Sequence, residues 1–128
     1  MTGRAGRWAA ALAWAAGAHS LAVGAVLLFV PALLVRVGWP SPPDGFFVMQ
    51  GGAFHVVLGL GYLLEWRIHR RLQLLVLAKA CAVAFLGVTL ALGQAPPIAG
   101  LALAGDAAFL AAAALLERAV VQSRSESS

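Results

Sequence analysis

Four side chains with acid–base or hydrogen-bonding chemistry lie within long apolar stretches, namely His19, His55, Lys79 and Asp106. Lys79 is the only lysine and lies midway along the third stretch, whereas Asp106 is the only acid in the central part of the fourth. A charge at the centre of a membrane helix costs about 2.5–3.5 kcal/mol, so a partner of opposite charge is needed. We therefore expect Lys79 and Asp106 to face each other as an ion pair inside the protein.

These residue types permit several kinds of chemistry. Their polar groups could hydrogen-bond the oxygen of a small lipophilic molecule, such as a quinone or another isoprenoid. His19 and His55 could ligate a haem axially, but close helix packing at glycines disfavours a porphyrin. Asp106 and the histidines could relay protons during modification of a lipid-like substrate. Binding is favoured over catalysis, and the alternative is that the charges form a structural ion pair while the histidines bond neighbouring helices.

The composition indicates an integral membrane protein. The 128 residues are 62% hydrophobic and 11% charged, with a mean hydropathy of +0.89. A soluble domain of this size leaves too much surface exposed to hide so many apolar side chains. The pI near 10.7 does not indicate a nucleic-acid partner, because the basic residues are scattered at the ends of apolar segments. The single cysteine, Cys81, excludes a cysteine-based metal site within one chain, and we expect no metal.

A membrane span needs about 20 mainly apolar residues. The sequence predicts spans at 8–35, 46–66, 72–92 and 98–121, which form a single domain over residues 1–121. The first span is long enough to tilt or to bend near Pro31. Residues 122–128 are serine-rich and charged, which predicts a disordered cytoplasmic tail. The expected fold is all-α, an integral membrane antiparallel four-helix bundle.

The basic residues predict the orientation. Seven arginines fall on one side of the membrane in this threading, and only Arg36 falls on the other: Arg4, Arg7, Arg67, Arg70, Arg71, Arg118 and Arg124. By the positive-inside rule both termini of this multi-pass membrane protein are cytoplasmic. A cleaved secretory signal ending near Ala16-Gly17-Ala18 is disfavoured, because the apolar run continues to Val35.

A rise of about 1.5 Å per residue places all four embedded groups roughly 11–18 Å above the cytoplasmic face. Helical spacing adds Tyr62 to the face of His55, with Glu65 at its edge, and puts Glu117 on the face of Asp106. The predicted polar core is therefore His19, His55, Tyr62, Lys79 and Asp106. Glu65 and Glu117 are secondary members of a polar track toward the cytoplasmic interface.

The glycine-rich segment 51–64, the segment Leu77-Ala78-Lys79 and the dipeptide Gly105-Asp106 carry a family resemblance. This pattern resembles the DoxX-like family of small bacterial membrane proteins with four helices. The resemblance implies a polar core that includes Lys79 and Asp106. Some DoxX-type proteins are linked to quinone-coupled sulfur oxidation or to membrane redox complexes, which implies a redox setting.

Three functions follow from the sequence. The first is binding of a small lipophilic ligand in the polar site. The second is a non-catalytic subunit or assembly factor of a larger membrane complex, docking a membrane partner or another copy through small exposed residues: Ala9, Ala10, Ala13 and Gly17. The third is a membrane redox or lipid-modifying enzyme. A proton-coupled drug exporter is disfavoured, because span one carries His19 and no carboxylate.

Overall fold

The computed structural model describes residues 4–36, 38 and 45–125. It has five helices in this part of the chain: α1 (Arg4–Phe29), α2 (Ala32–Arg36), α3 (Gly45–His69), α4 (Gln73–Ala91) and α5 (Ala99–Ser125). Four of them, all except α2, are long and apolar enough to cross a membrane. The prediction of an all-α fold with four membrane helices is confirmed, and the chain is a small multi-pass membrane protein.

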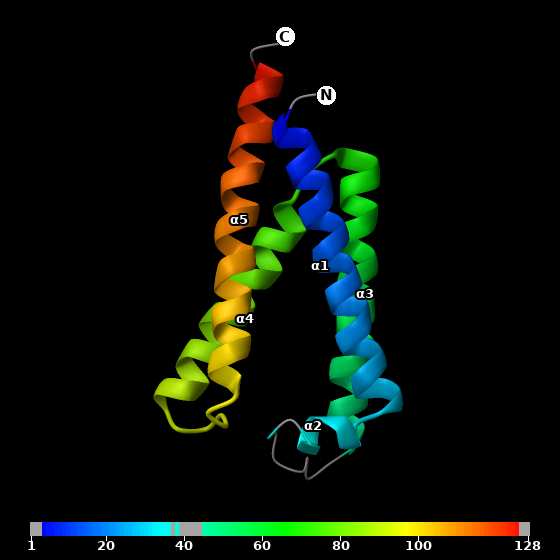
Figure 1. The fold of residues 1–128 in the computed structure, drawn as a ribbon, viewed down its shortest axis with the longest axis vertical. Coiled ribbons are helices and arrows are strands. Elements are labelled where there is room, and N and C mark those ends of the chain that lie inside the picture. The colour runs from blue at the N-terminus through cyan, green and yellow to red at the C-terminus, as the bar shows by residue number, and fades with distance from the viewer. Residues whose placement is uncertain (1–3, 37, 39–44, 126–128) are drawn as a thin grey trace.

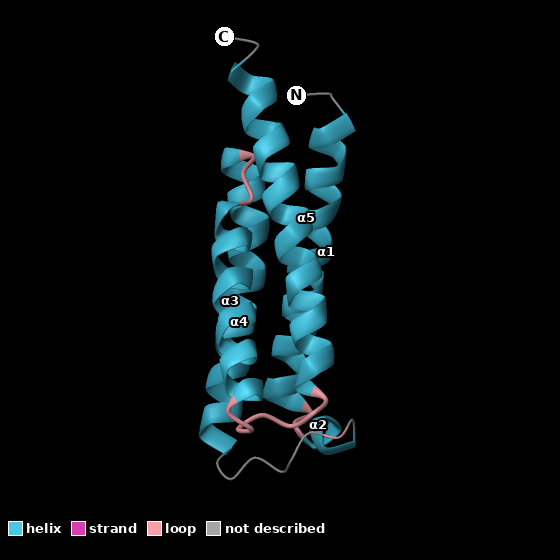
Figure 2. Ribbon diagram, turned by 90° about the vertical axis from the view of Figure 1, so that its left-hand side faces the viewer, coloured by secondary structure: helices cyan, strands magenta, loops and turns pink. Residues whose placement is uncertain are grey.

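The long helices pack as two antiparallel pairs, α1 with α3 and α4 with α5. The pairs also touch each other, mainly through α1 and α5. They meet at the end that carries both chain termini and diverge toward the end that carries α2 and the α4–α5 turn (Figure 1). We call these the closed end and the open end. The bundle is therefore a wedge, and a view from the side shows the same helices running along its whole length (Figure 2).

The buried core lies at the closed end. Its members are four alanines and five larger side chains: Ala9, Ala13, Ala16, Tyr62, Trp66, Leu72, Leu75, Ala113 and Val120. Alanine lets helices approach closely, so the four helices converge where it is most frequent. Toward the open end many large apolar side chains are exposed, including Phe29, Phe47, Phe85 and Leu101. Such a surface suits contact with lipid hydrocarbon rather than with water.

Two glycine pairs form the seam between α1 and α3. A Cβ atom on Gly24 would lie 2.9 Å from the carbonyl oxygen of Gly52, and one on Gly59 would lie 3.0 Å from that of Gly17. The first distance is shorter than real Cβ contacts and the second is at the limit of the tightest ones, so glycine lets the two backbones come this close. On each helix the two glycines are seven residues apart, which is two helical turns. The prediction that glycines of the second span allow close helix approach is confirmed.

The first predicted span, 8–35, is two helices rather than one. α1 ends at Phe29 because Pro31 has no N–H to donate and its ring would clash with the carbonyl of Leu27. The chain then restarts as α2, whose first turn is closed by the Leu33 N–H bonding the Val30 oxygen at 2.9 Å. The first span was expected either to tilt or to bend near Pro31. The structure shows a complete break of the helix there.

The ends of the last two helices have local causes. α4 ends where Gly93 takes a φ of +67°, and the N–H of Gln94 bonds the Thr89 oxygen at 2.8 Å. These contacts form a Schellman motif, which satisfies the last free carbonyls of the helix.

α5 continues to Ser125, so the prediction of disorder from residue 122 is wrong for residues 122–125. The hydroxyls of Ser123 and Ser125 donate back to the carbonyls of Val120 and Gln122 at 2.9 and 2.8 Å. Serine can thus satisfy its hydroxyl on its own helix, and a polar sequence here stays helical. Residues 126–128 lie outside the described residues.

Candidate functional site

The predicted ion pair between α4 and α5 is confirmed. The Lys79 amine donates to the Asp106 carboxylate. Lys79 is only 5% exposed, and the Asp106 side chain is also mostly covered. Each charge therefore has its partner inside the protein, which offsets the cost of removing both from water.

The ring of Phe109 connects this ion pair to α1. The Lys79 amine lies 5.3 Å from the ring centroid of Phe109, a cation–π distance. The His19 ring stacks on the same phenyl ring, with centroids 5.9 Å apart and an angle of 28° between planes. Groups from α1, α4 and α5 thus meet around one aromatic side chain.

His55 brings α3 to the same place. It lies within electrostatic range of His19, Lys79 and Asp106. Its Nδ1 atom is buried and makes no hydrogen bond to any of the described residues. A buried polar atom left without a partner costs about 1–3 kcal/mol, so this nitrogen favours a further bonding group beside it. Tyr62 lies two turns along the same face and is 2% exposed.

A cavity of about 720 Å³ adjoins all five residues of the predicted polar core. Its other walls are almost entirely apolar, and come from every helix: Val23, Leu27, Leu34, Val48, Leu58, Ala78, Ala82, Phe85, Leu86, Leu101, Ala102 and Phe109. Leu34 belongs to α2, and Val48, Leu86 and Leu101 lie near the helix ends at the open end. The cavity therefore extends from a polar region toward the open end, and its volume lies in the range that holds small organic ligands.

Glu65 and Glu117 do not line this cavity. Instead, both carboxylates hold the beginning of α4. The two oxygens of Glu65 accept from the Leu74 N–H at 3.1 and 3.0 Å. Glu117 accepts from the Leu72 N–H at 2.8 Å and pairs with Arg71. The two acids thus supply the hydrogen bonds that the first N–H groups of a helix lack.

The sequence carried a signal for this arrangement. The N-cap residue of α4 is Leu72, whose side chain cannot accept a hydrogen bond. An uncapped helix start in a membrane must find acceptors elsewhere, and within the part of the chain that the structure describes the acids near this level are Glu65 and Glu117. Their role as secondary members of a polar track stays a prediction, and they lie apart from the cavity.

Ser20 was missed by the sequence reasoning. It is 1% exposed, lines the cavity beside His19, and carries the only hydroxyl group of α1. A lone hydroxyl next to an embedded histidine was the available signal. Among the described residues no group of three or more His, Cys, Asp or Glu side chains could hold a metal ion.

The prediction that small residues of α1 form an exposed docking face is wrong. Ala9, Ala13 and Gly17 are buried, and Ala10 packs against the core. The reason is the position of α1, which packs against both α3 and α5. Its small residues are therefore used within the chain and are not exposed to a partner.

The chain matches no model of a protein family, no curated protein and no solved structure. The DoxX-like resemblance thus stays a prediction, of which the four candidate membrane helices are the part that the structure supports.

Proposed function

We propose that the protein binds one small lipophilic molecule with a polar head, of the quinone or isoprenoid class, in the cavity between its helix pairs. It would do so in the bacterial plasma membrane with both termini in the cytoplasm. The observation that carries the proposal is the buried, unpartnered Nδ1 of His55 beside a cavity with apolar walls. A purely apolar ligand would leave that nitrogen without a bond, and a water-soluble ligand would not suit those walls.

The donors around the cavity suit a carbonyl or hydroxyl oxygen. A lysine amine has three N–H groups, of which Asp106 takes one from Lys79. The other two can serve the head of a ligand, and His55 offers a further bonding atom on the facing helix. Asp106 and Phe109 hold the amine in place, so little freedom is lost when a ligand binds. Because the His19 ring stacks on Phe109, we assign it a packing and hydrogen-bonding role rather than haem ligation.

The direction of the cavity supports a long apolar tail. Its lining runs from Lys79 and Asp106 to Leu34, Leu86 and Leu101 near the open end. There the two helix pairs diverge (Figure 1). A ligand could place its head among the polar groups while its tail passes between the pairs toward the lipid.

Filling the cavity tests this proposal. Gly105 lines the cavity, and a Cβ atom built there meets nothing within 4 Å, so Gly105→Leu adds volume to the cavity without a clash. Gly100→Leu is the matched control, because Gly100 is also on α5, has equal room and does not line the cavity. Mass spectrometry of lipid extracts from the purified proteins should find one amphiphile with the natural protein and the control. Gly105→Leu should lower its occupancy at least about tenfold, a loss of 1.4 kcal/mol. Equal extracts from all three proteins would overturn the proposal.

The polar head is tested separately with His55→Leu. Since Nδ1 makes no hydrogen bond to the described residues, this change should not lower the stability of the ligand-free bundle. Added decylubiquinone should bind more weakly by about 1–3 kcal/mol, the value of one lost bond to a buried polar group. Unchanged affinity would show that the head does not contact His55.

A further inference from the structure

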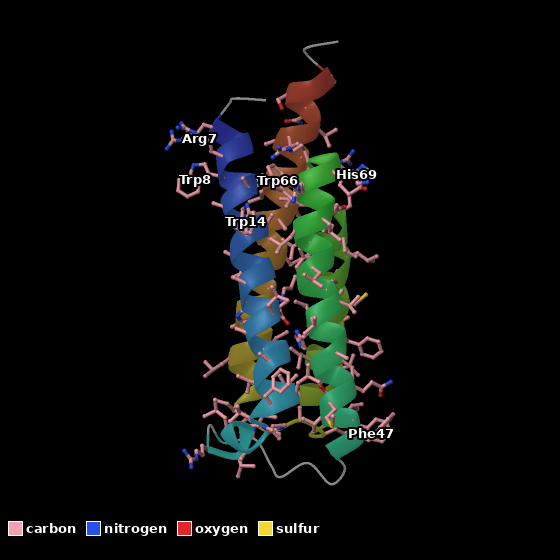
Figure 3. The ribbon with its side chains drawn as sticks, turned by 90° about the vertical axis from the view of Figure 1, so that its right-hand side faces the viewer. Arg7, Trp8, Trp14, Phe47, Trp66 and His69 are labelled. Carbon is pink, nitrogen blue, oxygen red and sulfur yellow. The ribbon has the colours of Figure 1, made fainter. Side chains whose placement is uncertain are left out.

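The wall of the cavity carries one cation and one anion, and the two are paired with each other. Among the described residues that line it, Lys79 is the basic one and Asp106 the acidic one, and the Lys79 amine donates to the Asp106 carboxylate. No described arginine lines the cavity. Arg7, for example, lies at the closed end, whereas Phe47 lies at the open end (Figure 3). The lysine and the aspartate therefore leave the cavity wall without a net charge.

A neutral pair of this kind disfavours a charged ligand head. An anion beside Lys79 would also lie beside the Asp106 carboxylate, whose repulsion offsets the attraction of the amine. An ion that leaves water for apolar surroundings loses its hydration, and only an unpaired opposite charge compensates for that loss. The apolar walls of the cavity offer no such charge. A phosphate or carboxylate head would therefore be buried without a cation of its own.

The same two side chains suit a hydroxyl group. The Lys79 amine has two N–H groups besides the one that Asp106 accepts. A carboxylate has about four lone-pair sites, so Asp106 can accept a second bond beside the one from Lys79. A donor and an acceptor thus lie next to each other on the cavity wall. A hydroxyl oxygen can accept from the amine while its O–H donates to the carboxylate, whereas a carbonyl or ether oxygen can use only the amine.

We infer that the head of the ligand is an uncharged hydroxyl group and that Asp106 selects it. This rests on the proposed ligand cavity, which would then take alcohols and quinols but not isoprenoid phosphates. The Asp106 carboxylate acts in two ways, because it accepts the hydroxyl proton and repels an anion. A hydrogen bond from a hydroxyl to a carboxylate is charge-assisted and stronger than a neutral one. Lys79 can donate to any oxygen head, so the discrimination comes from Asp106.

The test uses probes that share one geranylgeranyl chain and differ only in the head: the alcohol, its methyl ether and its monophosphate. Each competes with decylubiquinone for the full-length protein in phosphatidylcholine nanodiscs, at about pH 8, where an ordinary imidazole is uncharged. The natural protein should bind the alcohol at least about tenfold more tightly than either the ether or the phosphate. Equal affinity for the alcohol and for either of the other probes would overturn the inference.

Asp106→Asn tests the role of the carboxylate. This change keeps the size of the side chain and removes its charge, so a phosphate can then pair with Lys79. The variant should bind the phosphate at least about tenfold more tightly than the natural protein does. Glu117→Gln is the matched control, because it removes one negative charge from the same helix outside the cavity lining. A gain in both variants, or in neither, would overturn the inference. If Asp106→Asn does not insert, the three probes on the natural protein still decide.

Gly105→Leu separates this inference from the proposed function, because it fills the cavity whatever the head of the ligand. If the natural protein prefers none of the three heads but Gly105→Leu weakens the binding of all three, the ligand cavity stands and the selection of a hydroxyl is wrong. If Gly105→Leu binds every probe as tightly as the natural protein does, the probes do not enter the cavity, and both proposals are wrong.

Discussion

The two helix pairs are held together by different forces. α1 and α3 meet along a seam of glycines, where backbone touches backbone at Gly17 with Gly59 and at Gly24 with Gly52. α4 and α5 meet through the ion pair of Lys79 with Asp106, and the turn before α4 is held to α5 by the ion pair of Arg71 with Glu117. One pair thus depends on glycines at the helix contact, and the other on particular charged side chains.

This difference explains where the polar groups lie. The seam of glycines is filled by the helix backbones and by leucine and valine side chains, whereas His19 and His55 line the cavity. In the other pair, Lys79 and Asp106 join the helices and are themselves part of the cavity wall. Glycine by itself does not mark a helix contact: a Cβ atom on Gly87, Gly100 or Gly105 would meet nothing within 4 Å.

The largest effect should come from breaking the charged pair. Lys79→Met leaves Asp106 mostly covered without its partner, which should cost about 3–5 kcal/mol of stability. Unfolding by sodium dodecyl sulfate in mixed micelles measures the loss. The double variant Lys79→Met with Asp106→Leu should recover most of it, because two apolar side chains need no partner. A single variant as stable as the natural protein would contradict an ion pair that holds α4 to α5.

The glycine seam should respond next. In Gly24→Ala the new methyl group meets the Gly52 oxygen at 2.9 Å and the Val56 nitrogen at 3.1 Å, both of them backbone atoms. Neither can rotate aside, so the helices must separate, at a cost of about 1–3 kcal/mol in the same unfolding assay. Gly87→Ala enters open space and serves as the control, with little change expected. Equal stability of both variants would contradict the conclusion that close glycine packing holds α1 to α3.

The smallest effect should follow from loosening the start of α4. Glu65→Leu removes the two acceptors of the Leu74 N–H and should cost about 1 kcal/mol, as for a lost helix cap. Hydrogen exchange at the Leu74 amide should become faster, while the Val83 amide in the middle of α4 serves as an internal reference. Unchanged exchange at Leu74 would mean that Glu65 does not hold the helix end.

The sequence predicts positions along the membrane normal better than positions within its plane. Hydropathy located the four spans, and the depths of Lys79 and Asp106 predicted their ion pair. Hydropathy and depth do not predict how far the helix pairs diverge, because the divergence depends on helix tilt and on which small residues meet. The sequence did not decide between a bend and a helix end at Pro31, since a proline permits either.

The roles of the acidic residues show the same limit. Glu65 lies at the edge of the helix face of His55, and Glu117 shares the face of Asp106. These shared faces predicted that the two acids extend a polar track. Their contacts go instead to the backbone of a third helix. Side-chain periodicity describes each helix separately, whereas a capping contact depends on how helices are placed around one another.

The ion pairs between α4 and α5 also have a consequence for biosynthesis. Lys79 leaves the ribosome 27 residues before Asp106, and Leu72 leaves it 45 residues before Glu117. At ordinary rates of chain elongation these gaps last roughly 1–9 s. During that time the Lys79 amine has no compensating charge and the Leu72 amide has not met its acceptor, so α4 stays at the insertion machinery or near the headgroups. The insertion of α5 therefore allows α4 to stay in the membrane interior.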